Sequence, residues 1–165
     1  MPLAPPITDI EQLKAHPALG RLMESIPAAV TAAKFDREEL TVWIDKGSIR
    51  EACAILRDYD SCPFNYLADL TCLDWYPSEP RFEVVYHLLS IPTKERVRLK
   101  ARLDGSSASI ESVTSVWPAA NFYEREVFDL FGVRFTGHPN LKRIMMPDDW
   151  EGHPLRKDYP VEGYR

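Results

Sequence analysis

Four charged side chains stand together in the most aromatic stretch of the chain, NFYEREVFDLFG at residues 121–132. They are Glu124, Arg125, Glu126 and Asp129. A carboxylate pair, Glu124 or Glu126 with Asp129, has the residue types for general acid–base catalysis. The same cluster also fits a structural ion-pair network, a solvated helix face or a docking surface. The rest of the chain has to decide between these interpretations.

The remaining sequence offers little that would make these carboxylates an active site. It has no Ser–His or Cys–His signature and no Gly-rich phosphate-binding loop. Cys53, Cys62 and Cys72 lack the close pairing that usually marks zinc and iron–sulfur sites, so we interpret them as small core residues. His138 and His153 each precede a proline, which holds them extended, and we interpret both as turn elements rather than metal ligands.

Composition narrows the function classes further. The 165 residues fit one domain, or one domain with an arm. The chain carries 20 Lys and Arg against 25 Asp and Glu, a balance that argues against binding nucleic acid through its phosphates. No apolar run reaches the roughly 20 residues of a membrane helix, and the start, MPLAPPITDIEQ, does not resemble a secretory signal. We expect a protein of a reducing compartment, the cytoplasm.

The elements that must position the charged cluster indicate an α+β fold. Short helices are predicted within 9–26, and a two-stranded hairpin turns around residues 36–38. Ser48 and Glu51 have the spacing of a capping box, which predicts a helix over 48–58. We expect a small, mostly antiparallel sheet of about five strands with helices packed on it. Its last three strands are predicted in 64–76, 81–90 and 95–103, with turns at 77–80 and 90–93.

Residues 118–131 are predicted to form the helix that carries the cluster. Pro118 suits a first turn, and Gly132 suits the left-handed position that ends a helix. Glu126 lies at the border of the apolar stripe of this helix and therefore needs a cation or hydrogen-bond donors. We expect that cation among Arg134, Lys142, Arg143, Arg156 and Lys157. The stripe consists of Ala120, Tyr123, Val127, Leu130 and Phe131.

Asp129 stands at an unfavourable position for local helix stability. It lies in the last turn, where the helix dipole disfavours an anion by a few tenths of a kcal/mol. Arg125 precedes it by four residues and is its expected surface neighbour, in the weaker order for such a pair. Something beyond the helix therefore selects this arrangement.

The tail after Gly132 cannot bury its own apolar side chains. It is rich in proline and glycine, shows no sustained helical period, and has one short strand or turn expected near 141–146. Yet it contains aromatic, Met and Arg residues of the kind that interface cores favour. We expect an extended docking arm over 132–165, an α+β domain over 9–131, and an extended Pro-rich segment over 1–8.

Residues 124–160 contain Glu-Arg-Glu-x-x-Asp-x-x-Gly, then Gly-His-Pro, then Pro-Leu-Arg-Lys-Asp-Tyr-Pro. This run resembles the C subunit of the proton-pumping NADH–quinone oxidoreductase, respiratory complex I. The segment SVTSVWPAANFY before it is also similar. The related photosynthetic J subunit shares the first element but departs from GHPLRKDYP, which this chain keeps, so the resemblance favours the respiratory form.

The resemblance implies a structural subunit of the hydrophilic arm of that complex. Such a subunit carries no cofactor, packs beside the D subunit, which holds the quinone site, and lies near the B and I subunits, which hold the terminal iron–sulfur clusters. The whole complex passes electrons from NADH through FMN and iron–sulfur clusters to quinone and couples this to proton translocation. The implied location is peripheral, on the cytoplasmic side of the plasma membrane.

Two alternatives remain open beside this hypothesis. One is a homologous subunit of a related machine, a membrane-bound hydrogenase or the photosynthetic complex. The other, more remote, is a free-standing carboxylate or metal enzyme. Under the first hypothesis no residue is catalytic, and the partner interface and its ion pairs comprise Glu124, Arg125, Glu126, Asp129, His138, Pro139, Arg143, Trp150, Pro154, Leu155, Arg156, Lys157, Asp158 and Tyr159.

Overall fold

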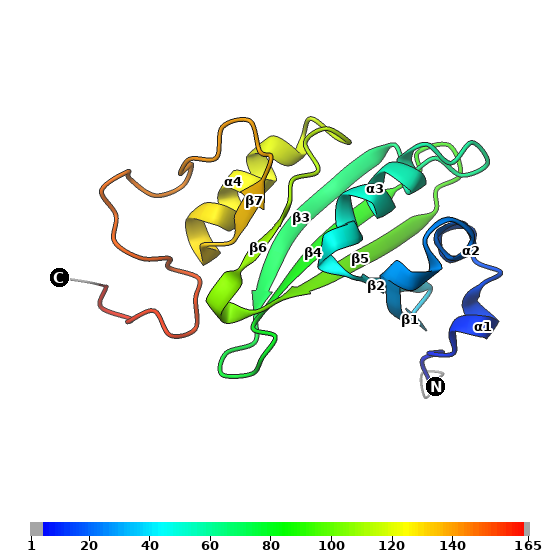
Figure 1. Cartoon of the computed structure of the whole chain (residues 1–165), viewed down its shortest axis with the longest axis horizontal. Helices are drawn as coiled ribbons and strands as arrows, with labels where there is room; N and C mark the ends of the chain where they lie inside the picture. Colours follow the sequence, from blue (N-terminus) through cyan, green and yellow to red (C-terminus); the bar gives the residue numbers. More distant parts are fainter. Residues whose placement is uncertain (1–4, 164–165) are drawn as a thin grey trace.

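The computed structural model describes residues 5–163 and has the expected α+β architecture (Figure 1). Five strands form one sheet in the order β1-β2-β5-β4-β3. Neighbouring strands are antiparallel except β2 and β5, which run parallel, so the sheet is mixed. The strands are β1 (Val30–Asp36), β2 (Glu39–Ile44), β3 (Tyr66–Asp74), β4 (Phe82–Leu89) and β5 (Arg96–Leu103).

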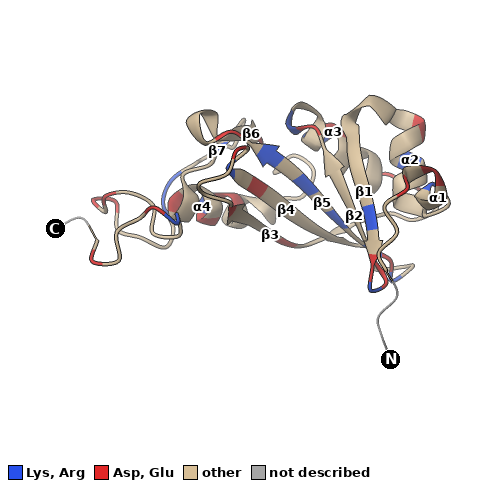
Figure 2. Ribbon diagram, turned by 90° about the horizontal axis from the view of Figure 1, so that it is seen from below, with Lys and Arg blue, Asp and Glu red and all other residues tan. Residues whose placement is uncertain are grey.

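Helices cover one face of this sheet. Figure 1 shows α3 lying across the strands, and Figure 2, turned by 90°, places α2 and α3 on the same side of the sheet. The alternation of the strands explains this arrangement, because every second residue of β5, from Val97 to Leu103, is buried against the helices. The helices before β3 are α1 (Ile10–Leu13), α2 (Pro17–Ser25) and α3 (Ile49–Arg57), with short 3₁₀ turns at Pro27–Ala29 and Lys46–Ser48.

The opposite face of the sheet is polar and carries its own buried carboxylate. Glu83 on β4 accepts hydrogen bonds from Trp43 Nε1 at 2.9 Å and Lys100 Nζ at 2.8 Å, and Arg102 lies 3.2 Å away. Burial alone would raise the pKa of Glu83, but these donors hold it below its ordinary value. Glu83 therefore cross-links strands β2, β4 and β5 on the side without helices.

A smaller unit follows the sheet. After the 3₁₀ turn Gly105–Ser107, β6 (Ser109–Glu111) pairs in parallel with β7 (Arg134–Thr136), and α4 (Ala120–Phe131) connects them. Helix α4 lies beside the edge strand β3, where Tyr123 Oη donates to the Ala68 carbonyl at 3.4 Å. After β7 the chain runs away from the sheet as an open loop, the orange to red segment of Figure 1. We call residues 137–163 the arm.

Several local predictions need correction. Ser48 makes no side-chain cap, and Asp45 instead accepts a hydrogen bond from Gly47 N at 2.9 Å to cap the preceding 3₁₀ turn. The helix expected from Pro118 begins at Ala120. The segment 141–146, expected to be a short strand or turn, forms no strand and has a bend at residues 144–146. The β6–β7 pair was not predicted, since three-residue strands leave no periodicity to detect.

Other predictions are confirmed. The hairpin, the three consecutive antiparallel strands and the two short N-terminal helices are present. All three cysteines are buried core residues, with the pKa of the Cys72 thiol raised by burial to about 12. The expected extended segment 1–8 lies partly outside the described residues. Within it, Ile7 forms an antiparallel bridge with Phe35.

Candidate partner interface

Glu124 lies inside the domain, and its hydrogen-bond partners there are Ser112 and Val113. Its side chain is fully buried on α4, where Oε2 accepts from Ser112 Oγ at 2.6 Å and Oε1 from Val113 N at 2.7 Å. Burial raises the pKa of this carboxyl to about 7, because the two donors compensate only part of the lost hydration. Glu124 thus fastens α4 to the segment that follows β6.

Replacing Glu124 by glutamine is expected to remove a pH dependence of stability. The pKa of Glu124 is higher in the folded chain than its ordinary 4.5. The stability contributed by its neutral form is therefore full below pH 4.5 and is lost as the pH rises to about 7. The loss amounts to about 3 kcal/mol. A glutamine can accept from Val113 N and donate to Ser112 Oγ, so the variant should keep that stability above pH 7.

Urea unfolding measured from pH 4.5 to above pH 7 tests this expectation. Glu126→Gln is the matched control, because Glu126 is exposed on the same helix. The control should follow the wild-type pH profile. If the free energy of unfolding of Glu124→Gln falls with rising pH as steeply as that of the wild type, Glu124 does not cause the pH dependence.

Asp129 is the first point at which the domain holds the arm. Its Oδ2 accepts hydrogen bonds from three consecutive backbone N–H groups of the arm, at 3.0, 2.8 and 2.9 Å. Its Oδ1 accepts from Arg143 Nη1 at 2.7 Å. We call this group the Asp129 anchor; the three N–H donors are Ile144, Met145 and Met146.

The charge state of the Asp129 anchor follows from its surroundings. Asp129 is fully buried, and burial alone would raise its pKa. The backbone N–H donors and the Arg143 guanidinium outweigh burial and hold the pKa below its ordinary value. This is why a carboxylate is stable in the last turn of α4, where the helix dipole opposes it.

Two further side chains strengthen the attachment near α4. Arg125 donates from Nε to the Lys142 carbonyl at 3.1 Å and from Nη2 to the Arg143 carbonyl at 3.0 Å. His153 Nδ1 lies 2.8 Å from the Asp129 carbonyl. The arm is therefore bound through its backbone as well as through ion pairs.

Gly132 ends α4 and leaves room for the arm to approach. Its φ of 75° is left-handed, as predicted for the position after a helix. A Cβ atom at this position would lie 2.5 Å from Arg156 Nη2 and 2.6 Å from His153 Cδ2. Both the backbone angle and the close contact with the arm require glycine here.

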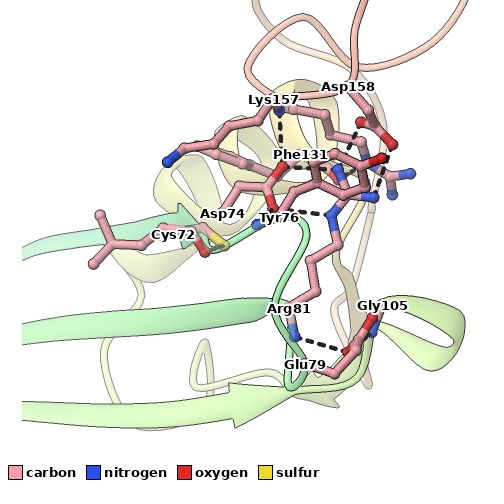
Figure 3. A network of polar contacts seen from close by, with 11 residues as sticks. Cys72, Asp74, Tyr76, Glu79, Arg81, Gly105, Phe131, Lys157 and Asp158 are labelled. Atoms are coloured by element: carbon pink, nitrogen blue, oxygen red, sulfur yellow. Dashed lines mark hydrogen bonds and ion pairs between the residues drawn. The ribbon is translucent and has the colours of Figure 1, made fainter.

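Arg81 is the second point at which the domain holds the arm (Figure 3). Its guanidinium forms two hydrogen bonds with Asp74, at 2.9 and 2.8 Å, and two with Asp158 of the arm, at 2.9 and 2.6 Å. Asp74 also accepts from the backbone N–H of Lys157 at 2.8 Å. We call Arg81 with these three residues the Arg81 anchor.

The Arg81–Asp74 pair of the Arg81 anchor is almost completely buried. The Asp74 side chain is 1% exposed and that of Arg81 is 11% exposed. Although burial alone would raise the pKa of Asp74, Arg81 and the backbone donors lower it to about 2. The guanidinium also lies 4.9 Å from the ring centres of Tyr76 and Phe82. The paired carboxylate and the two rings together fix the position of Arg81.

Arg156 lies beside the Arg81 anchor and adds a third contact. Its Nε donates to the Phe131 carbonyl at 2.6 Å, and its guanidinium lies 5.2 Å from the Phe82 ring centre. Next to it, Leu155 N donates to the Leu130 carbonyl at 3.0 Å. These carbonyls are the unpaired acceptors at the end of α4, so the arm completes the hydrogen bonding of that helix end.

The predicted site residues divide into three groups in space. Asp129, Arg143 and Arg125 meet at one anchor, and Lys157 and Asp158 at the other. His138 caps a turn of its own, with Nδ1 accepting from Asn140 N at 3.0 Å. The remaining members lie along the arm, and some are exposed to solvent. They are Pro139, Trp150, Pro154, Leu155, Arg156 and Tyr159, of which Trp150 and Leu155 are 39% and 51% exposed.

Two expectations about the charged helix are wrong. Glu126 is exposed and takes part in none of the ion pairs of residues 5–163, so it needs no cation. Arg125 and Asp129 do not pair with each other as neighbours on the helix; each binds the arm instead. The helical wheel gave the wrong partners because it assumes one face of α4 packed on the sheet and all other faces in water. In the structure the arm covers a second face of α4.

Asp74 and Arg81 are the principal functional residues that the sequence did not reveal. They lie on opposite sides of the turn between β3 and β4, and their arm partner Asp158 is 77 residues beyond Arg81. No periodicity or motif connects positions so distant. The one available signal was the position of Asp129 against the helix dipole, which indicated a partner outside the helix.

The two anchors hold the backbone of the arm in place and leave many of its side chains exposed. Within residues 5–163 no three His, Cys, Asp or Glu side chains are grouped as a metal site would require. Both anchors are ion pairs completed by backbone donors. Between and beyond them the arm exposes large apolar side chains, chiefly Met145, Trp150, Leu155 and Val161.

Comparisons with known proteins agree on one family. The family model for the respiratory-chain NADH dehydrogenase 30 Kd subunit matches residues 42–165. The C subunit of NADH-quinone oxidoreductase from Roseiflexus sp. (strain RS-1) is 47% identical over 143 residues, which are 87% of this chain and 82% of that protein. The corresponding C subunit of Geobacter metallireducens is 48% identical over 147 residues, 88% of this chain and 90% of its own length.

Solved structures give the same result. The trypsin-resistant fragment (1-134) of Nqo5 matches with a TM-score of 0.61 and 32% identity, and the match covers 75% of this chain and 99% of the fragment. A chain of the membrane-bound sulfane sulfur reductase, an archaeal respiratory membrane complex, matches with a TM-score of 0.75 and 31% identity, covering 90% of this chain and 86% of that one.

The fold and its relatives thus define a subunit of a respiratory oxidoreductase complex. Among the described residues, no helix is long and apolar enough to cross a bilayer. The chain belongs to the family of the 30 kDa subunit of respiratory-chain NADH dehydrogenase, whose bacterial members include the C subunit of NADH–quinone oxidoreductase.

Proposed function

We propose that this chain is a cofactor-free assembly subunit in the hydrophilic arm of complex I. Its α+β domain carries the arm of residues 137–163 and presents it to the D subunit, which holds the quinone site, with the B and I subunits nearby. FMN and the iron–sulfur clusters belong to those and other subunits. The complex transfers electrons from NADH to quinone and couples this transfer to proton translocation. This chain lies at the periphery of the complex, on the cytoplasmic side of the membrane.

The observation that carries this proposal is the contrast between the arm's backbone and its side chains. The backbone is fixed by two anchors, yet Met145 is 62% exposed and Val161 is 104% exposed. Ordering a segment costs roughly 1–2 kcal/mol of backbone entropy per residue. A segment that is ordered without burying its apolar side chains is preorganised for a partner that will bury them.

The relative solved as a trypsin-resistant fragment supports the same division of labour. The fragment of Nqo5 covers 75% of this chain, so a core of this family is compact without the remainder. By that likeness, the domain here supplies the stable body, and the arm supplies the contacts between subunits.

One observation favours a second candidate machine. The archaeal sulfane sulfur reductase chain has a higher TM-score, 0.75, than the Nqo5 fragment, 0.61. A homologous subunit of a related membrane complex, including the membrane-bound hydrogenases, would use the same domain and arm. Isolation of the native assembly distinguishes them, because complex I would contain bound flavin and oxidise NADH, whereas the alternatives would not.

Charge reversal at Arg125 is expected to weaken assembly while the domain stays folded. Glutamate in place of Arg125 removes the two hydrogen bonds to the arm carbonyls at 142 and 143 and repels them. Because Arg125 lies near the surface, the loss in unfolding free energy should stay at or below about 1 kcal/mol. Recovery of partner subunits with a tagged chain and circular dichroism of the isolated chain measure the two effects.

Arg37→Glu is the matched control for this experiment. Arg37 is exposed in the β1–β2 turn, away from the arm, and its reversal changes the net charge equally. The control should assemble normally. If the Arg125 variant assembles normally but its complex no longer transfers electrons, the chain has a role in chemistry and the assembly proposal is wrong.

A further inference from the structure

The arm encloses a hollow with a distinctive lining. Residues 149–151 and 159–163 curve around a volume of about 470 Å³. Tyr159 Oη donates to the Glu151 carbonyl at 3.3 Å and so holds the two segments together. The hollow lies in the part of the chain farthest from the sheet, near the C-terminal end in Figure 1.

Negative charge is concentrated at this hollow. Residues 147–163 contain five acidic and two basic residues, and Figure 2 shows acidic positions along the loop. Asp158 forms an ion pair with Arg81. Asp149, Glu151 and Glu162 line the hollow, are exposed, and take part in none of the ion pairs formed by the described residues. Carboxylates that share a small space repel each other until a cation joins them.

The apolar part of the lining favours the same kind of ligand. Trp150 lines the hollow and remains 39% exposed, and Val161 is fully exposed beside it. An indole face attracts a guanidinium or ammonium group, and the aliphatic stem of Lys or Arg packs on apolar surface. An aromatic ring with carboxylates around it is therefore complementary to a long cationic side chain.

We propose that this hollow receives a Lys or Arg side chain from a basic segment of the partner protein to which the arm docks. The inference rests on the proposed function and adds the chemistry of the partner surface. The two anchors hold the arm backbone in one position, and the carboxylates around the hollow select a positively charged side chain. Attraction between the acidic loop and a basic partner surface also orients the two proteins before contact.

Site-specific photo-cross-linking from position 161 in the intact complex tests the proposal. A photoreactive residue replaces Val161, whose side chain is fully exposed. The cross-linked partner peptide is then identified by mass spectrometry. We expect a peptide with Lys or Arg at or next to the cross-linked residue, and a cross-linking yield that falls as salt is added.

A neutralised hollow gives the quantitative comparison. The triple change Asp149→Asn, Glu151→Gln and Glu162→Gln should reduce cross-linking and recovery of the partner about tenfold, as expected for the loss of one charge-assisted contact. The control triple alters exposed acidic residues elsewhere, Glu24→Gln, Glu38→Gln and Asp60→Asn, and should behave as the wild type.

Three outcomes overturn the inference: equal yields from both triples, a cross-linked peptide without a cationic residue, or cross-links to no protein at all. The outcome is separable from that of the proposed function. If Arg125→Glu impairs assembly but the neutralised hollow does not, the arm docks and only the cationic ligand is wrong. If Arg125→Glu assembles normally, the proposed function itself fails.

Discussion

Replacing Asp129 by alanine is expected to release the arm from the domain. The substitution leaves Arg143 Nη1 and three backbone N–H groups without an acceptor, while Arg143 Nη2 keeps the carbonyls of Trp150 and Gly152. Removing one partner of a buried ion pair costs about 3–5 kcal/mol. The arm can avoid this cost by detaching into water, so the loss should appear as local opening before it appears as global unfolding.

Hydrogen exchange at residues 144–146 and tryptic cleavage after Lys142 and Arg143 measure this opening. Both should accelerate strongly in Asp129→Ala and less in Asp129→Asn, which keeps one acceptor oxygen. Asp148→Ala is the control, because Asp148 is an exposed arm residue outside the anchor. Unchanged exchange at 144–146 in Asp129→Ala would show that other contacts hold the arm.

Replacing Arg81 by methionine is expected to produce the second large effect. The change removes four hydrogen bonds and leaves Asp74 buried with backbone donors alone. The expected loss is again about 3–5 kcal/mol. Unlike Asp129, Asp74 belongs to β3 and cannot move into water without opening the sheet, so this loss should appear in the global free energy of unfolding.

Acid titration adds a specific signature for Arg81. The pKa of Asp74 is lowered to about 2 from 3.8, so its stabilising contribution is present above pH 3.8 and is lost as the pH falls to about 2. That contribution is about 2 kcal/mol. Urea unfolding of Arg81→Met should show a smaller acid loss than the wild type.

Arg102→Met is the matched control for Arg81. Arg102 pairs with Glu83, but its side chain is 50% exposed, so its removal should cost less than about 1 kcal/mol. Equal losses in the two variants would contradict the assignment of Arg81 as a buried anchor. Arg81→Lys should fall between wild type and methionine, because one ammonium cannot reproduce two bidentate contacts.

The sequence revealed most of the sheet because its evidence is local. Alternation in residues 95–103 is visible without knowing what lies opposite, and β5 occupies Arg96–Leu103. The same holds for the helix that carries the charged cluster, which ends at Gly132 as expected. The parallel pairing of β2 with β5 could not be predicted in this way, because strand order depends on which edges meet in space.

The same reasoning from local sequence patterns identified only part of the candidate site. Asp129 was recognised as misplaced for its helix, but its donors come from backbone N–H groups at 144–146, which have no sequence signature. Glu124 was seen as one charge among four, although it is fully buried and Glu126 is exposed. Periodicity assigns faces to a helix but does not count how many neighbours cover it.

The parallel contact between β2 and β5 bears on the order in which the domain forms during synthesis. The β1–β2 hairpin leaves the ribosome early, yet its neighbour in the sheet is the last of the five strands to be made. Until β5 has been synthesised, the edge of β2 that faces away from β1 has no strand to pair with and stays exposed. The nascent chain is therefore most prone to aggregation before β5, which ends at Leu103, has left the ribosome. The arm is translated after this stage.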